Sequence, residues 1–170
     1  FLLISFMISF WSFNLNAADW TMASGYPKSN FHTQNIMKFI DEVKANTSVN
    51  INLNPNDTLI KLDAIKTSLQ RGQIPIGEIR FGIYGNEDPM YILAGLPFIA
   101  PDYASAWLLK EVKHEYLQNL FNKKGLKILY TSPWPGQGFY TKTPVNGVSD
   151  FKGKKLRIYS TATQQMGTML

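Results

Sequence analysis

Residues 19–53 read DWTMASGYPKSNFHTQNIMKFIDEVKANTSVNINL, and this stretch decides the fold class. Asp19–Ser24 alternates large and small side chains and is predicted to form a strand. Apolar residues then recur every three or four positions, which predicts an amphipathic helix over Asn30–Ala45. Val49–Leu53 alternates again and is predicted to form a second strand. A strand, a helix and a strand in this order favour a parallel pair joined by a right-handed crossover.

A second helix and a third strand are predicted next, so the chain is expected to begin with the element order β-α-β-α-β. Apolar residues recur at helical spacing from Leu59 to Leu69, which predicts a second helix ending near Gly72, and Ile74–Ile79 is predicted as a third strand. A longer helix is expected to begin after the cap residue Asp102 and to end at Gly125. Its core-facing residues are expected to be Ala104, Leu108, Val112, Tyr116 and Leu120.

Three short β-prone runs follow the long helix. Strands are predicted at Leu126–Tyr130, Phe139–Lys142 and Leu156–Tyr159, and a further helix opens at Ser160. Arg157 lies near the carboxyl end of the last run, the edge at which open α/β sheets bind ligands. Its planar, permanently charged guanidinium matches a carboxylate with two parallel hydrogen bonds. The plainer alternative is a solvated surface arginine.

The first residues have the pattern of an export signal. Phe1–Phe13 is almost wholly apolar and uncharged but is too short to span a membrane. Small residues follow at positions 16–18, before polar sequence begins. We therefore expect residues 1–18 to be a signal peptide that lacks its charged start, with cleavage after Ala17 or Ala18. A buried N-terminal strand or helix is the alternative.

The composition argues against several classes of function. The chain has 170 residues, no cysteine and a net charge of +5. Thiolate catalysis and cysteine metal sites are therefore absent, and His32 and His114 lack partners at ligand spacing, so no metal is expected. Few aromatic residues accompany the lysines, so no nucleic-acid groove is expected. No Walker loop occurs, and Gly136-Gln-Gly138 lacks a third glycine at dinucleotide spacing, so no cofactor is expected.

One enzymatic alternative rests on three carboxylates. Glu78, Glu87 and Asp88 could supply paired acids for general acid–base chemistry. Such residues more often hydrogen-bond loop backbone or face solvent. The chain offers instead the parts to hold a small anion, namely an arginine, amide-rich loops and the aromatic side chains of Tyr26, Trp134 and Tyr159.

Several segments occur together in the order of a known family. They are Gly72-Gln-Ile-Pro-Ile-Gly-Glu78, Leu96-Pro-Phe98, Gly125-Leu-Lys-Ile-Leu129 and Asp150-Phe-Lys-Gly-Lys-Lys-Leu-Arg157. With the export signal and the β-α-β-α-β start, residues 19–170 resemble the DctP-type extracytoplasmic receptor of tripartite ATP-independent periplasmic (TRAP) transporters. The resemblance implies an α/β fold like that of type II periplasmic binding proteins, with two α/β domains around a ligand cleft. Residues 19–125 would form the first domain, and 126–170 would begin a second domain that is incomplete here.

The resemblance also implies a function and a site. Such a receptor captures a small organic acid and delivers it to a TRAP permease, and it lies in the periplasm without being embedded in the membrane. Arg157 stands where the family arginine pairs with the carboxylate, and Glu78 matches an acidic position facing the cleft in some members. Some sialic-acid-binding members carry a second arginine near Gln137, so its absence argues against that substrate. The expected ligand-binding residues are Arg157, Gln137, Glu78, Trp134, Tyr26, Asn30 and Tyr159, and no residue is expected to be catalytic.

Two alternatives to a TRAP receptor stay open from the sequence. A receptor for an ATP-driven importer can share the two-domain shape. A secreted enzyme would need two titratable groups converging on a scissile bond, whereas a binding protein needs one arginine facing a closed cleft and no activated nucleophile.

Overall fold

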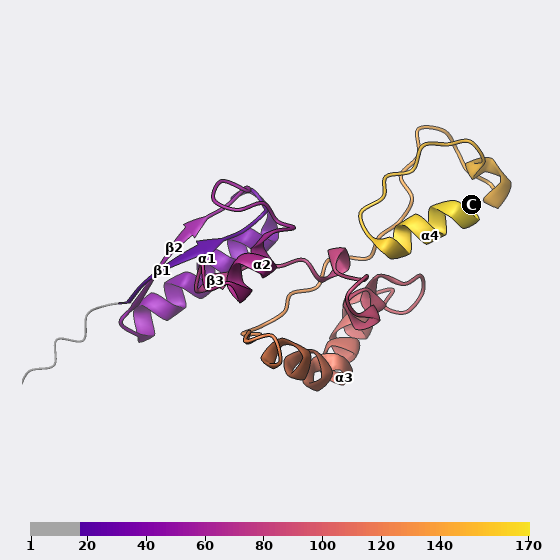
Figure 1. Cartoon of the computed structure of the whole chain (residues 1–170). Coiled ribbons are helices and arrows are strands. Elements are labelled where there is room, and N and C mark those ends of the chain that lie inside the picture. Colours follow the sequence, from indigo (N-terminus) through magenta and orange to yellow (C-terminus); the bar gives the residue numbers. More distant parts are fainter. Residues whose placement is uncertain (1–17) are drawn as a thin grey trace, which may run out of the picture.

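The computed structural model describes residues 18–170, so the expected signal peptide lies outside the described residues apart from Ala18. The N-terminal part is built on a parallel sheet with strand order β2-β1-β3 (Figure 1). The strands are β1 (Ala18–Ala23), β2 (Val49–Asn54) and β3 (Ile76–Gly77). The predicted strand at Ile74–Ile79 is therefore shortened to β3, but the predicted parallel order is confirmed.

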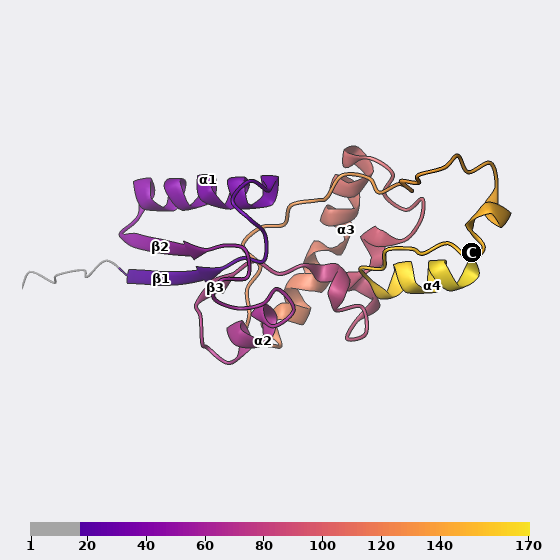
Figure 2. The ribbon, with the colours of Figure 1, turned by 90° about the horizontal axis from the view of Figure 1, so that it is seen from above.

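The two faces of this sheet carry different helices. α1 (Phe31–Asn46) packs on the face to which Met22 points, and α2 (Ile65–Gln70) packs on the face to which Ala23 points. Because neighbouring strand residues point to opposite faces, these two adjacent side chains enter separate cores. Ile65 is completely buried in the second core. Figure 2 shows α1 and α2 on either side of the strands.

The first half of the predicted second helix is wrong. α2 spans only Ile65–Gln70, and the residues before it form turns. The Asp57 carboxylate accepts a hydrogen bond from the backbone N–H of Leu62 at 2.9 Å. This bond satisfies a backbone donor without a helix, as short polar side chains often do in loops. Leu59 consequently stays 46% exposed.

The long helix begins where the sequence predicts but buries a different face. α3 (Tyr103–Asn122) is capped by the Asp102 carboxylate, which accepts from the backbone N–H of Ser105 at 2.8 Å. Leu108 and Val112, expected in the core, are 67% and 73% exposed. The buried side chains are Lys113, Leu117 and Phe121. The buried row is offset by one residue, about 100° around the helix, so the expected core stripe is wrong.

Aromatic residues from the preceding loop explain this offset. Three short 3₁₀ turns, Phe81–Ile83, Pro89–Tyr91 and Leu93–Gly95, connect β3 to α3. They bring Tyr84 and Tyr91 into one core cluster with Leu117 and Phe121 of α3. Large aromatic surfaces at this end of α3 therefore decide which face is buried.

The strands predicted after α3 are absent from the described residues 18–170. The segments Leu126–Tyr130, Phe139–Lys142 and Leu156–Tyr159 run as irregular chain, which continues from α3 toward the C-terminus in Figure 1. A strand exists only where a neighbour shares its backbone hydrogen bonds, and none of these segments has such a neighbour here. One 3₁₀ turn, Val148–Phe151, interrupts this part of the chain.

The last helix, α4 (Thr161–Met169), begins as predicted. The Ser160 hydroxyl accepts from the backbone N–H of Thr163 at 3.2 Å, and the Thr163 hydroxyl accepts from the backbone N–H of Ser160 at 3.0 Å. This reciprocal cap satisfies two otherwise unpaired donors. No helix within residues 18–170 combines the length and the apolar character that crossing a membrane requires.

Candidate functional site

Polar side chains gather where β1 and β3 end. Tyr26 follows β1, and Glu78 and Arg80 follow β3. Since the carboxyl ends of parallel strands meet at one edge of the sheet, these residues share the edge at which open α/β sheets bind ligands. All three line a broad cleft of about 1970 Å³. The cleft is therefore larger than a typical pocket for a small ligand, which has about 300–1,000 Å³. The polar side chains that converge at the strand ends mark the part of the cleft where a ligand would bind.

Glu78 is the carboxylate of this site. Its Oε2 accepts a hydrogen bond from the Ser24 hydroxyl at 2.5 Å, which joins the ends of β3 and β1. Burial raises the pKa of Glu78, and the bond from Ser24 opposes this rise only in part. Glu78, an expected ligand residue, lines the cleft, and its contact with a ligand stays a prediction.

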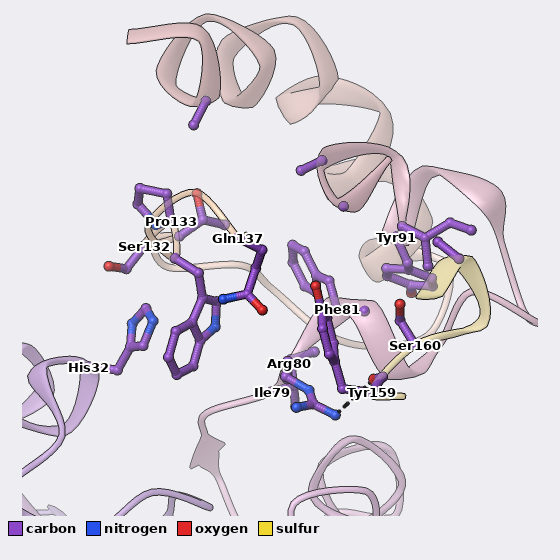
Figure 3. Close-up of a pocket in the computed structure, with 18 of the residues that line it drawn as sticks. His32, Ile79, Arg80, Phe81, Tyr91, Ser132, Pro133, Gln137, Tyr159 and Ser160 are labelled. Atoms are coloured by element: carbon purple, nitrogen blue, oxygen red, sulfur yellow. Dashed lines mark hydrogen bonds between the residues drawn. The ribbon is translucent and has the colours of Figure 1, made fainter. Parts of the chain in front are cut away.

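Arg80 lies in the same cleft and was missed by the sequence analysis. Its Nη2 donates to the backbone carbonyl of Tyr159 at 3.2 Å, the dashed line in Figure 3. Its Nε is buried without a hydrogen-bond partner among residues 18–170, and no carboxylate of that range forms an ion pair with it. The signal was available, because Arg80 directly follows the predicted strand Ile74–Ile79 and so lies at the carboxyl end of a strand, the position for which Arg157 was selected.

Trp134 packs against an aromatic cluster at the start of α1. Its ring centroid lies 4.3 Å from that of His32, 5.2 Å from that of Tyr26 and 5.3 Å from that of Phe31. The indole is nevertheless 42% exposed and lines the cleft. One part of the ring is therefore held by the cluster, and the rest is accessible from the cleft.

His32 is the second residue that the sequence analysis did not connect with the site. It is 6% exposed, and its Nε2 is buried with no hydrogen-bond partner among residues 18–170. Burial lowers the pKa of His32, so the imidazole is neutral at pH 7. Asn30, expected to bind ligand, is instead the N-cap of α1, and its Oδ1 accepts from the backbone N–H of His32 at 2.9 Å. Asn30 does not line the cleft.

The remaining expected ligand residues enter the cleft from the second half of the chain. Arg157, Gln137 and Tyr159 all line it. The Arg157 guanidinium lies 6.0 Å from the centroid of the Tyr159 ring and forms no ion pair among residues 18–170. Figure 3 shows Gln137 and Tyr159 around the same space as Arg80 and His32. Their contact with a ligand remains a prediction.

The three carboxylates of the enzymatic alternative do not converge. Glu87 is bound by two lysines, and the Asp88 carboxylate accepts from the Tyr116 hydroxyl at 2.7 Å. Neither lines the cleft that contains Glu78, so the described residues do not form the grouping that the enzymatic alternative requires. In the part of the chain that the structure describes, no three histidine or acidic side chains are placed to hold a metal ion.

Comparisons with known proteins agree with this geometry. The model of the family described as bacterial extracellular solute-binding protein, family 7 (DctP), matches residues 22–169. Two extracytoplasmic solute receptors of Bordetella pertussis that bind pyroglutamic acid, DctP6 and DctP7, are 34% and 37% identical to this chain, each with a TM-score of 0.86. A marine metagenome TRAP solute binding protein specific for pyroglutamate is 35% identical, with a TM-score of 0.84.

These similar structures are longer than the present chain. They match 89%, 90% and 90% of it, whereas it covers 51%, 52% and 51% of theirs. The chain therefore spans about half their length. The likeness confirms the predicted fold class, an α/β fold of the type II periplasmic-binding-protein kind. A comparison with curated proteins gave no match.

Proposed function

Because the chain belongs to bacterial extracellular solute-binding protein family 7, we propose that it is part of a receptor that captures a small organic acid and delivers it to a TRAP-type membrane transporter. The observation that carries this proposal is the likeness, over about nine-tenths of the chain, to receptors for pyroglutamate. Arginine, aromatic and amide side chains in one cleft suit a small anion.

The ligand that we propose is L-pyroglutamate or a closely related cyclic acid. Its carboxylate would pair with Arg157, whose guanidinium faces the cleft without an acidic partner in residues 18–170. Its flat, largely apolar ring would pack against the accessible part of Trp134. Its ring N–H would suit the second carboxylate oxygen of Glu78, since Ser24 binds the first.

The division into domains is also a proposal. Residues 19–125 would form the first domain, and 126–170 would begin the second. In support, the structural relatives are about twice as long, and Tyr140, Val148 and Ile158 are left 92%, 65% and 53% exposed here. A structure of the complete receptor with residues 126–170 packed wholly inside the first domain would contradict it.

We place the receptor in the periplasm, with the membrane subunits of the transporter as its partners. The apolar run at residues 1–13 and the small residues after it support export by a signal peptide. The mature protein should then begin at Ala18 or Asp19 when its N-terminus is sequenced.

Calorimetry on the full-length receptor tests the proposed function. L-pyroglutamate should bind with a dissociation constant in the micromolar range or below, because a charge-assisted pair in a closed cleft adds to burial of the ring. Glucose, which has no carboxylate, should not bind. Failure of every small organic acid in a screen that includes pyroglutamate would reject a receptor of this class.

Ligand binding should also change the fluorescence of Trp134. The indole is 42% exposed at the cleft, so a ligand packed against it would change its solvation. In Trp134→Phe we expect most of the change induced by pyroglutamate to disappear. Trp107→Phe is the comparison variant. Trp107 also lines the broad cleft, but its ring contacts Lys110 and not the cluster around Tyr26, so that variant should keep most of the change. An unaltered signal in Trp134→Phe would place Trp134 away from the ligand.

A further inference from the structure

We propose that Arg80, Tyr26 and His32 form a distinct subsite of the cleft that binds an uncharged carbonyl oxygen of the ligand, opposite the carboxylate held by Arg157. The inference rests on the proposed function and adds to it the part of the ligand that decides specificity. It requires a ligand that carries both a carboxylate and a separate carbonyl group, as a lactam acid does.

Three buried polar atoms carry this inference. The Nε of Arg80, the hydroxyl of Tyr26 and the Nε2 of His32 are all buried, and none has a hydrogen-bond partner among residues 18–170. They come from different elements, yet all three side chains line the same cleft. A buried polar atom left unpaired destabilises the folded state, so several unpaired polar atoms around one cleft are unusual in a folded protein.

Tyr26 lies beside each of the other two residues. The rings of Tyr26 and His32 have their centroids 6.1 Å apart. Burial raises the pKa of the Tyr26 hydroxyl, and the positive charge of Arg80 and a side-chain interaction with it oppose this rise, so the hydroxyl and the guanidinium are neighbours.

The chemistry of these atoms selects an acceptor. The Arg80 Nε–H can only donate, the Tyr26 hydroxyl can donate, and a neutral imidazole can donate from one nitrogen. Converging donors fit an oxygen that accepts several hydrogen bonds, as a carbonyl does. Arg80 already binds one carbonyl in this way, because its Nη2 donates to the backbone oxygen of Tyr159.

The surrounding charge favours a neutral oxygen over a second carboxylate. Glu78 and Arg80 both act on the Tyr26 hydroxyl, the carboxyl raising its pKa and the guanidinium lowering it. The opposite charges of Glu78 and Arg80 offset each other near Tyr26. A negatively charged ligand group would therefore gain little electrostatic stabilisation there. A dicarboxylate would also bring its second carboxylate toward Glu78, which costs free energy.

A matched pair of ligands isolates the carbonyl group. Cyclopentanecarboxylate and 3-oxocyclopentanecarboxylate share the ring and the carboxylate, and the second carries a carbonyl where pyroglutamate has one. On the full-length wild-type receptor, calorimetry should show the oxo acid binding about tenfold more tightly, the effect of one or two hydrogen bonds in a closed site. Glutarate, a dicarboxylate, should bind more weakly than the oxo acid.

Arg80→Met should reduce this preference to below threefold and leave the affinity for cyclopentanecarboxylate nearly unchanged. Tyr26→Phe, which keeps the ring in its aromatic cluster, should reduce the preference in the same direction. Arg71→Met is the matched control, because Arg71 is exposed and does not line the cleft, and it should keep the tenfold preference.

The outcomes separate this inference from the proposed function. A wild-type receptor that binds none of these acids and no pyroglutamate overturns the function itself. A receptor that binds pyroglutamate but shows no preference for the oxo acid overturns the carbonyl subsite alone. Equal weakening of both cyclopentane acids in Arg80→Met and an unchanged preference in Tyr26→Phe would mean that Arg80 acts only by holding Tyr159, which also overturns the subsite.

Discussion

Replacing Arg157 by alanine should lower the affinity of the full-length receptor for L-pyroglutamate about 100-fold, or about 2.7 kcal/mol. Hydrogen bonds to charged groups each contribute about 1.5–3 kcal/mol, and a bidentate pair makes two of them. Arg157 lines the cleft and has no acidic partner among residues 18–170, so its charge is free to meet a ligand carboxylate. Calorimetry measures the change directly.

Two further variants show whether the affinity depends on the planar geometry of the guanidinium or on positive charge alone. Arg157→Lys keeps the charge but loses the planar fork, and we expect a loss of about tenfold. Lys142→Ala removes an exposed charge from a residue that does not line the cleft and should change the affinity less than threefold. Unchanged affinity in Arg157→Ala would remove Arg157 from the ligand site.

Local sequence patterns predicted the first α/β unit well. The alternation in residues 19–24 and 49–53 and the helical spacing in 30–45 are short-range signals, and the structure places β1, β2 and α1 there within one or two residues. Capping chemistry was equally reliable, since Asp102 and Ser160 both begin helices. These features depend on residues adjacent in sequence, which is why they could be read without the fold.

Features decided by distant partners could not be read in this way. The buried face of α3 is chosen by Tyr84 and Tyr91, which lie far from it in the sequence. Apolar runs such as Leu126–Tyr130 become strands only beside a neighbour, and no such neighbour is present in the described residues.

The site shows the same limit. Arg157 was found by its place near the carboxyl end of a β-prone run, and Arg80 could have been found by the same rule. His32 carried no usable signal, because one of the rings packed against it belongs to Trp134, about one hundred positions away. Its unpaired nitrogen therefore became visible only in three dimensions.

Replacing Glu87 by glutamine should lower the free energy of unfolding of the receptor by about 3 kcal/mol. Lys66 is 2% exposed, and its ammonium is paired with Glu87, whose other oxygen binds Lys124 at 2.6 Å. Glutamine keeps the shape of the side chain but removes the negative charge, which leaves a buried ammonium group uncompensated. Breaking one partner of a buried pair typically costs about 3–5 kcal/mol, and the lower end applies because Glu87 is 30% exposed.

The matched variant is Lys66→Met, which removes the buried charge itself. The methionine would fill the apolar space beside the Tyr84 ring, whose centroid lies 4.1 Å from the Lys66 ammonium. Glu87 would keep Lys124 as its partner. We therefore expect a loss below about 1 kcal/mol, since replacing a buried charge by an apolar group of similar size is often nearly neutral. Urea denaturation followed by circular dichroism compares the two variants.

The pH dependence provides an independent check on Glu87. Burial alone would raise its pKa, but the hydrogen bonds from Lys124 and Lys66 outweigh this effect, so the pKa lies below its usual value in the folded protein. A carboxyl group with a lowered pKa contributes stability above its unfolded pKa of about 4.3, and this contribution is lost as the pH falls through the folded value. The gap in stability between wild type and Glu87→Gln should therefore be full at pH 7 and should narrow below about pH 4. A gap that is the same at pH 7 and at pH 3, or a larger loss in Lys66→Met than in Glu87→Gln, would show that the buried ammonium group does not depend on Glu87 for its compensation.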